Sequence, residues 1–209
     1  EGGALETDGA GTLLATRSSV VTPTRNPGHS TQDVEGLLGA WLGIDRFLWL
    51  DHGDLSGDDT DGHIDTLARF ADPNTILHIT APPGDPDQPG LLAMIEQLQG
   101  LRTRDGRPYR LLPLPCAGVH LDDGRRLPAT YANFLIINQR VLMPAYGTDQ
   151  DTQAADTLQS AFPDREVVRI DCRPIIAQNG SLHCLTMQLP APMALNTAVE
   201  FDHACTSQA

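Results

Sequence analysis

The chain has 209 residues, of which 40% are hydrophobic, as is typical of one globular domain with its own core. Its 14 basic and 27 acidic residues give a net charge of −13, which argues against nucleic acid as a partner because phosphate contacts need clustered lysine and arginine. The same charge favours a cationic substrate, although acidic surfaces also serve simply to keep proteins in solution. No apolar run reaches the length of a membrane helix, so we expect no membrane partner.

The first predicted elements form a strand, turn, strand, helix and strand. Ser30 is placed to begin the helix, and Gly43 to end it. The elements of this first unit are strands at 13–16 and 20–23, a helix at 30–42 and a strand at 46–51.

Two later stretches repeat this order. The stretch at 134–171 is a full copy, with strands at 134–137 and 141–144, a helix at 148–162 and a strand at 166–171. The middle stretch is a looser copy, with a strand at 75–80, a helix at 90–98 and a strand at 109–114. Three modules of about 40 residues predict a radial or stacked architecture. The alternative is chance similarity between ordinary α/β segments.

The four cysteines are Cys116, Cys172, Cys184 and Cys205, and none forms a Cys-x-x-Cys pair. This spacing argues against a structural zinc site, so no metal is expected. Nothing indicates secretion, so reduced thiols in the cytoplasm are the default expectation. After Pro190, weak periodicity predicts a partly disordered tail over 191–209.

Cys184, His63 and Asp65 together offer a thiol, an imidazole and a carboxylate, the groups of a cysteine nucleophile with its acid/base partner. They lie near module junctions, which a radial repeat would bring to one axis. We read 182–188 as a strand, which turns His183 away from the thiol and makes His63 the better partner. On a strand, His63 and Asp65 would face one side. The competing interpretation of Cys184 is a buried, unreactive thiol.

The acidic run before His63 raises a metal alternative. An EF-hand loop with Gly62 in its sixth place would need Asp at Gly57 and Glu at Ala68, so it fails at both ends. A solvated turn that caps the following segment is the simpler interpretation of this run.

Five segments of the chain resemble the agmatine deiminase and bacterial-type peptidylarginine deiminase family. The likeness runs from Glu1 to about Pro190. The segments are Glu1-Gly2-Gly3, Asp58-Asp59-Thr60-Asp61-Gly62-His63-Ile64-Asp65, Thr130-Tyr131-Ala132-Asn133-Phe134, Phe162-Pro163-Asp164-Arg165-Glu166-Val167 and Gly180-Ser181-Leu182-His183-Cys184-Leu185-Thr186-Met187-Gln188.

This resemblance implies an α/β fold, a pseudo-fivefold α/β propeller (pentein) of ββαβ modules. By the same resemblance Cys184 is the nucleophile, His63 the general acid/base and Asp65 a carboxylate that grips a guanidinium. Glu1 matches a glutamate near the catalytic histidine, and Asn133 matches an asparagine that lines the site. No metal or organic cofactor is implied.

The implied activity is a cysteine-dependent hydrolysis of a small cationic guanidine through an amidino-cysteine intermediate. Agmatine is the favoured substrate, giving N-carbamoylputrescine and ammonia for putrescine and polyamine biosynthesis. The alternatives are a protein- or peptidyl-arginine deiminase and a noncatalytic propeller that only binds. Gln178-Asn179-Gly180-Ser181-Leu182 stands where agmatine deiminases carry Gly-Gly-Gly-Asn-Ile, which keeps the peptidyl substrate open.

Family members also have an upstream portion that supplies a further aspartate. The chain begins at Glu1 without a Met, so we expect residues 1–190 to be the C-terminal part of one propeller domain, about three of five modules. Such an opened propeller exposes strand edges, so we expect either a homo-oligomer or association with the N-terminal portion.

Overall fold

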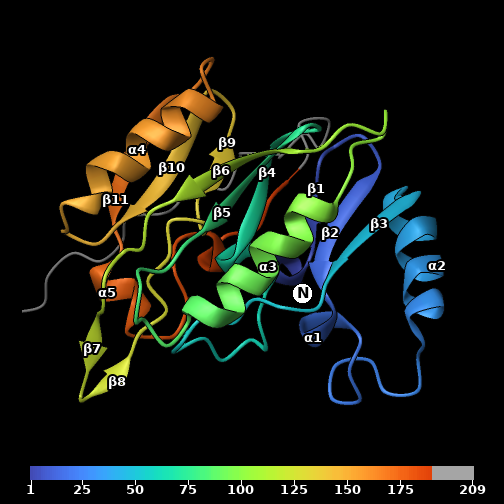
Figure 1. The fold of residues 1–209 in the computed structure, drawn as a ribbon, viewed down its shortest axis with the longest axis horizontal. Coiled ribbons are helices and arrows are strands. Elements are labelled where there is room, and N and C mark those ends of the chain that lie inside the picture. Colours follow the sequence, from blue (N-terminus) through green and yellow to red (C-terminus); the bar gives the residue numbers. More distant parts are fainter. Residues whose placement is uncertain (190–209) are drawn as a thin grey trace, which may run out of the picture.

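A computed structural model describes residues 1–189, in which three small sheets are built on one plan (Figure 1). In each sheet the central strand pairs antiparallel with the strand before it and parallel with the strand that follows a helix. The chain therefore contains three ββαβ modules, which confirms the predicted repeat and shows that the middle copy is complete. A crossover helix between parallel strands is what such a connection requires.

The elements of the three modules are as follows. Module 1 contains β1 (Glu6–Thr7), β2 (Thr12–Thr16), α2 (Thr31–Leu42) and β3 (Arg46–Leu50). Module 2 contains β4 (Ala68–Asp72), β5 (Thr75–Ile79), α3 (Gln88–Gly100) and β6 (Arg110–Leu114). Module 3 contains β9 (Leu135–Ile137), β10 (Arg140–Ala145), α4 (Gln150–Ala161) and β11 (Glu166–Asp171).

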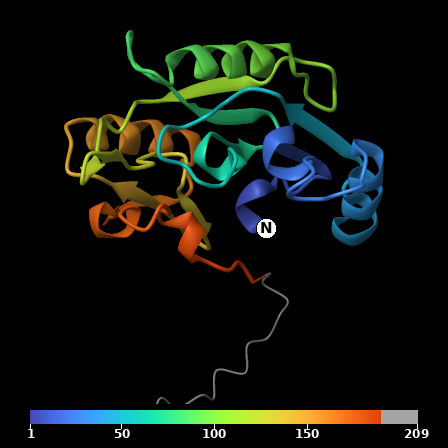
Figure 2. The same cartoon turned by 90° about the horizontal axis from the view of Figure 1, so that it is seen from below.

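Short elements connect or extend these modules. They are the 3₁₀ turns η1 (Gly2–Ala4), η2 (Ile64–Thr66) and η3 (His183–Leu185), the short helices α1 (Arg17–Val20) and α5 (Arg173–Ile176), and the hairpin strands β7 (Leu121–Asp122) and β8 (Arg125–Arg126). Figure 2 shows α2, α3 and α4 on the outside of the arc of modules, with the chain start and the red segment at about 175–189 on the inside. The inner side is where the candidate site lies.

Helix α2 begins where the sequence predicts. The Ser30 hydroxyl accepts a hydrogen bond from the Asp33 backbone at 3.2 Å, and the Asp33 carboxylate accepts one from the Ser30 backbone at 2.8 Å. This reciprocal capping box satisfies two backbone donors that the first turn would otherwise leave unpaired. The helix ends at Gly43, whose φ of 69° is the left-handed conformation that glycine adopts without strain.

The predicted strand at 20–23 is wrong. Arg17–Val20 is the short helix α1, which the Thr16 hydroxyl caps by accepting from the Ser19 backbone at 3.3 Å. Its place in the sheet is taken by β1, which pairs Glu6 with Leu14 and Thr7 with Leu13. Val20 is buried in a small apolar cluster, so its β-branched side chain reflects burial and not strand pairing.

The hydrophobic core is divided unequally. The larger cluster extends over all three modules and includes Leu14, Met94, Tyr131 and Leu158, whereas a small second cluster around Leu13 belongs to module 1 and its adjoining segments. Within residues 1–189 no helix is both long and apolar enough to cross a membrane. The predicted tail at 191–209, with Cys205, lies outside the described residues.

Candidate active site

Two walls of one cavity bring the sequence-predicted residues together on the inner side of the arc. One wall comes from the chain start and the turn that contains η2, and the other from the segment between α5 and η3. The cavity has a volume of about 490 Å³. It is lined by Glu1, Gly2, Gly3, Thr60, His63, Asp65, Ile175, Gln178, Asn179, Gly180, Cys184 and Leu185.

Asp65 is the buried carboxylate of this cavity, with only 1% of its surface exposed. Its Oδ2 accepts a hydrogen bond from His183 Nδ1 at 2.8 Å and lies 3.8 Å from Cys184 Sγ. Its Oδ1 is buried and has no hydrogen-bond partner within residues 1–189. A buried carboxylate oxygen without a donor is costly, so Asp65 keeps unused capacity to accept hydrogen bonds at the cavity wall.

Asn133 is fully buried and connects the two walls. Its Oδ1 accepts from the backbone N–H of His183 at 2.8 Å and from that of Cys184 at 3.3 Å. Its Nδ2 lies 3.3 Å both from the Asp65 carbonyl oxygen and from Cys184 Sγ. The Asn133 side chain thus fixes the turn η3 relative to η2 and positions the Cys184 thiol.

The Cys184 thiol is held in its protonated form by its surroundings. The residue as a whole is exposed, but partial burial of the thiol raises its pKa. The nearby Asp65 carboxylate raises the same pKa further, because a thiolate beside a carboxylate is repelled. A cation bound between them would reverse the second effect.

His63 contacts Glu1 on the other side of the cavity. Its Nε2 lies 2.8 Å from Glu1 Oε2, and this hydrogen bond, together with the Arg25 guanidinium, lowers the pKa of the glutamate. Gly3 packs tightly behind the imidazole. A Cβ added at Gly3 would lie 2.6 Å from His63 Nδ1 and 2.9 Å from Asp65 Oδ2, so a larger residue there would force the imidazole or the carboxylate to shift.

The predicted strand at 182–188 is wrong, because residues 183–185 form the 3₁₀ turn η3. In that turn His183 does not point away from the site. Its Nδ1 and the Cys184 Sγ approach the same Asp65 oxygen. His183, Gly3 and Arg25 are therefore site residues that were not predicted from the sequence.

The acidic run before His63 forms hydrogen bonds within its own turn. The Asp58 carboxylate accepts from the Thr60 hydroxyl at 2.7 Å and from the Gly62 backbone at 3.0 Å, as expected for a capped turn. Within residues 1–189 no three His, Cys, Asp or Glu side chains are grouped so as to hold a metal ion.

The fold and the cavity define a class: α/β proteins of repeated ββαβ modules with a thiol, an imidazole and a carboxylate around one inner cavity. The profile of the family described as Porphyromonas-type peptidyl-arginine deiminase matches residues 1–190. The chain belongs to this family.

Relatives and solved structures agree with that assignment. The agmatine deiminase of Pseudomonas fluorescens is 35% identical over 214 residues, covering 93% of this chain and 58% of the relative. A crystal structure from Porphyromonas gingivalis, provisionally named as an arginine deiminase, is similar with a TM-score of 0.89 and 55% identity, covering 91% of this chain and 57% of that one.

A third similar protein is a C. jejuni agmatine deiminase, whose structure carries a cysteine-to-serine substitution and a bound substrate. Its TM-score is 0.82 at 36% identity, covering 88% of this chain and 54% of that one. In all three comparisons the chain spans less than two thirds of its relative's length.

Proposed function

We propose that this chain carries the nucleophile and the acid/base group of a cysteine-dependent guanidine deiminase. The observation that carries the proposal is the buried Asp65 carboxylate, one oxygen of which has no partner within residues 1–189, in the lining of the cavity that Cys184 and His63 also line. A guanidinium is planar and cationic, and a carboxylate holds it by paired hydrogen bonds. Asp65 in this role would orient the guanidinium carbon toward Cys184 Sγ.

The reaction proceeds through a covalent intermediate in this proposal. The thiol proton passes to His63, and the thiolate attacks the guanidinium carbon to form a C–S bond. One C–N bond then breaks as the imidazolium protonates the departing ammonia, which leaves an amidino-cysteine. Neutral His63 next takes a proton from water, whose oxygen attacks the same carbon. The C–S bond breaks, releasing a ureido product and restoring the thiol.

Electrostatics favour activation by the substrate itself. Burial and Asp65 raise the pKa of the Cys184 thiol, so the empty site holds little thiolate. A guanidinium paired with Asp65 adds a positive charge near Sγ and lowers that pKa. The nucleophile would therefore form mainly when there is a substrate to attack.

Agmatine is the substrate that we favour, giving N-carbamoylputrescine and ammonia and thus serving putrescine formation. Support comes from the Pseudomonas fluorescens and C. jejuni relatives, which are agmatine deiminases. An arginine within a peptide is the second candidate, because the matching family is described by peptidyl-arginine. A noncatalytic binding role would need the carboxylate but not the thiol that lies 3.8 Å from it.

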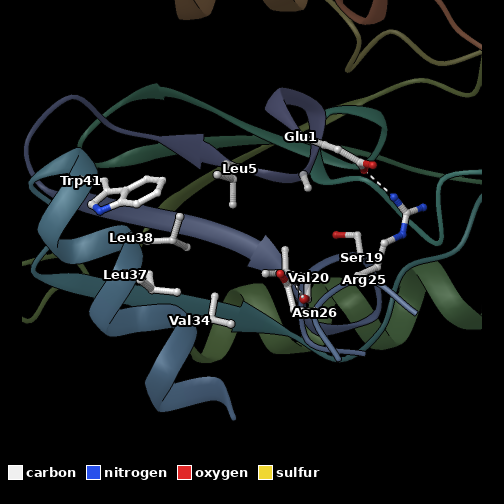
Figure 3. Close-up of a pocket in the computed structure, with 11 residues that line it drawn as sticks. Glu1, Leu5, Ser19, Val20, Arg25, Asn26, Val34, Leu37, Leu38 and Trp41 are labelled. Atoms are coloured by element: carbon white, nitrogen blue, oxygen red, sulfur yellow. Dashed lines mark hydrogen bonds and ion pairs between the residues drawn. The ribbon is translucent and has the colours of Figure 1, made fainter. Parts of the chain in front are cut away.

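We also propose that residues 1–190 form part of one pseudo-fivefold propeller domain, with two further modules supplied from upstream. The chain's share of its relatives, 58% for the Pseudomonas fluorescens protein, supports this proposal. An open groove beside α2 supports it too. The groove has a volume of about 390 Å³, and Leu37, Leu38 and Trp41 of α2 face β2 and the chain start in it (Figure 3).

The test is an assay of ureido product from agmatine, free arginine and an arginyl peptide, with Cys184→Ser as the control. A protein extended upstream to the length of its relatives should turn over agmatine fastest. Residues 1–209 alone should be inactive or nearly so, because the upstream carboxylate is missing. No turnover of any substrate by the extended protein would refute the enzymatic proposal.

A further inference from the structure

Arg25 lies directly behind the candidate site, on the far side of Glu1 from the main cavity. Its guanidinium is largely covered, with 22% of the side chain exposed. It donates to three acceptors: the Glu1 carboxylate, Asp61 Oδ2 at 3.2 Å and the Thr60 carbonyl oxygen at 2.9 Å. Figure 3 shows Arg25 and Glu1 pointing toward one another at one end of the groove.

Glu1 depends on Arg25 for its orientation. Within residues 1–189 the Glu1 carboxylate is held by polar contacts. A single oxygen, Oε2, receives both the Arg25 guanidinium and His63 Nε2 at 2.8 Å. A free glutamate side chain has rotamer entropy to lose, and a fixed guanidinium reduces the cost of meeting the imidazole.

Arg25 also holds the turn that leads to His63. Two of its three acceptors, Thr60 and Asp61, immediately precede that histidine, and the Thr60 hydroxyl accepts from the His63 backbone at 3.1 Å. The arginine is itself anchored, because the Asn26 side chain next to it donates to the Val20 carbonyl at 2.7 Å. Only the planar guanidinium fork can meet three acceptors in these directions, so lysine is not an equivalent residue here.

We propose that Arg25 is a positioning residue that holds the Glu1 carboxylate and the turn at 60–61 in the arrangement that contacts His63. The competing view is that Arg25 forms an ordinary surface ion pair with Glu1, which contributes little to stability. The two views predict opposite shifts of the His63 titration midpoint when Arg25 is replaced.

The measurement is the NMR titration midpoint of the His63 imidazole in the free protein. Glu1→Gln removes the anion beside the imidazole, so the midpoint should move to lower pH. If Arg25 positions Glu1, Arg25→Gln should also move the midpoint to lower pH, and the double variant should move it no further. If Arg25 acts only as a nearby cation, its removal should move the midpoint to higher pH.

Other charged groups face the imidazole and stay unchanged in these variants. Asp65 lies across Gly3 from it, and Cys184 lines the same cavity. The ionisable groups around His63 are Glu1 with its amino terminus, Arg25, Asp61, Asp65, Cys184 and, through Asp65, His183.

Arg25→Lys keeps the charge without the fork and should give a midpoint between those of the wild type and Arg25→Gln. Arg140→Gln removes an exposed arginine that is paired with Glu166 far from the site, and it should leave the midpoint unchanged. A midpoint that rises or does not move in Arg25→Gln would overturn the proposal. The titration needs no substrate, so its outcome is independent of whether the protein deiminates guanidines.

Discussion

The thiol side of the cavity is held by buried hydrogen bonds, whereas the imidazole side is held by charges close to solvent. Asn133 and Asp65 are 0% and 1% exposed, but the Glu1 side chain is 58% exposed. Buried hydrogen bonds resist salt and leave costly unpaired groups when broken, whereas exposed ion pairs are screened. We expect the nucleophile to be fixed in advance, while the acid/base side adjusts to pH, salt and substrate.

The largest expected effect is on the thiol side. Asn133→Ala leaves the backbone N–H groups of His183 and Cys184 without their side-chain acceptor, and it should lower the free energy of unfolding by about 3 kcal/mol. Urea unfolding measures this change. Gln153→Ala, at an exposed position on α4, is the control and should change stability by less than about 0.5 kcal/mol. A loss in Asn133→Ala no larger than that in Gln153→Ala would show that these buried hydrogen bonds do not hold the thiol side.

The second effect tests the support beneath η3. The buried Tyr146 hydroxyl accepts from the Thr130 backbone at 3.1 Å, donates to its carbonyl at 2.9 Å and lies 2.9 Å from Ser181 Oγ. Tyr146→Phe should cost about 2 kcal/mol in thermal or urea unfolding. Tyr109→Phe is matched to it, because the buried Tyr109 hydroxyl has no hydrogen-bond partner within residues 1–189, and it should be close to neutral.

The third effect concerns the charge of Asp65. Its carboxylate raises the pKa of the Cys184 thiol, so Asp65→Asn should lower that pKa and increase the thiolate fraction at pH 7. Alkylation of Cys184 by iodoacetamide, followed by peptide mass spectrometry, should become several-fold faster. Deimination by the extended protein should be lost in the same variant. Slower alkylation would show that Asp65 does not oppose the thiolate.

The smallest effect belongs to the imidazole side. The pKa of Glu1 is lowered by His63 and Arg25, so these contacts weaken as pH falls and the glutamate becomes protonated. Raising the salt concentration from about 0.05 to 0.5 M should move the NMR titration of Glu1 toward that of an ordinary glutamate by a few tenths of a unit. The Cys184 alkylation rate should stay nearly constant over the same range, and a large salt effect on it would contradict the contrast.

Local signals in the sequence predicted the helices well. Ser30 with Asp33, and then Gly43, define both ends of α2 by backbone chemistry that depends on few distant residues. Strand β1 was missed because a strand of two residues, Glu6 and Thr7, carries no periodicity to detect. It exists because β2 offers it a pairing edge, which is a tertiary effect.

The site was predictable as a set of residues but not as an arrangement. The thiol, imidazole and carboxylate could be chosen by chemistry, and the repeat gave a reason for them to meet. The error at His183 came from assuming a strand, in which neighbours alternate between faces; in the 3₁₀ turn both His183 and Cys184 reach Asp65. Arg25 carried no signal, because its three acceptors come together only in the fold.

Gly3 has a practical consequence for experiments on this site. Because a Cβ at this position would overlap both His63 Nδ1 and Asp65 Oδ2, Gly3→Ala should force the imidazole and the carboxylate apart while leaving every reactive group intact. Such a variant would disturb only the alignment of the reactive groups, whereas replacing the thiol or the carboxylate removes a reactive group itself. It would separate the contribution of alignment from that of functional groups.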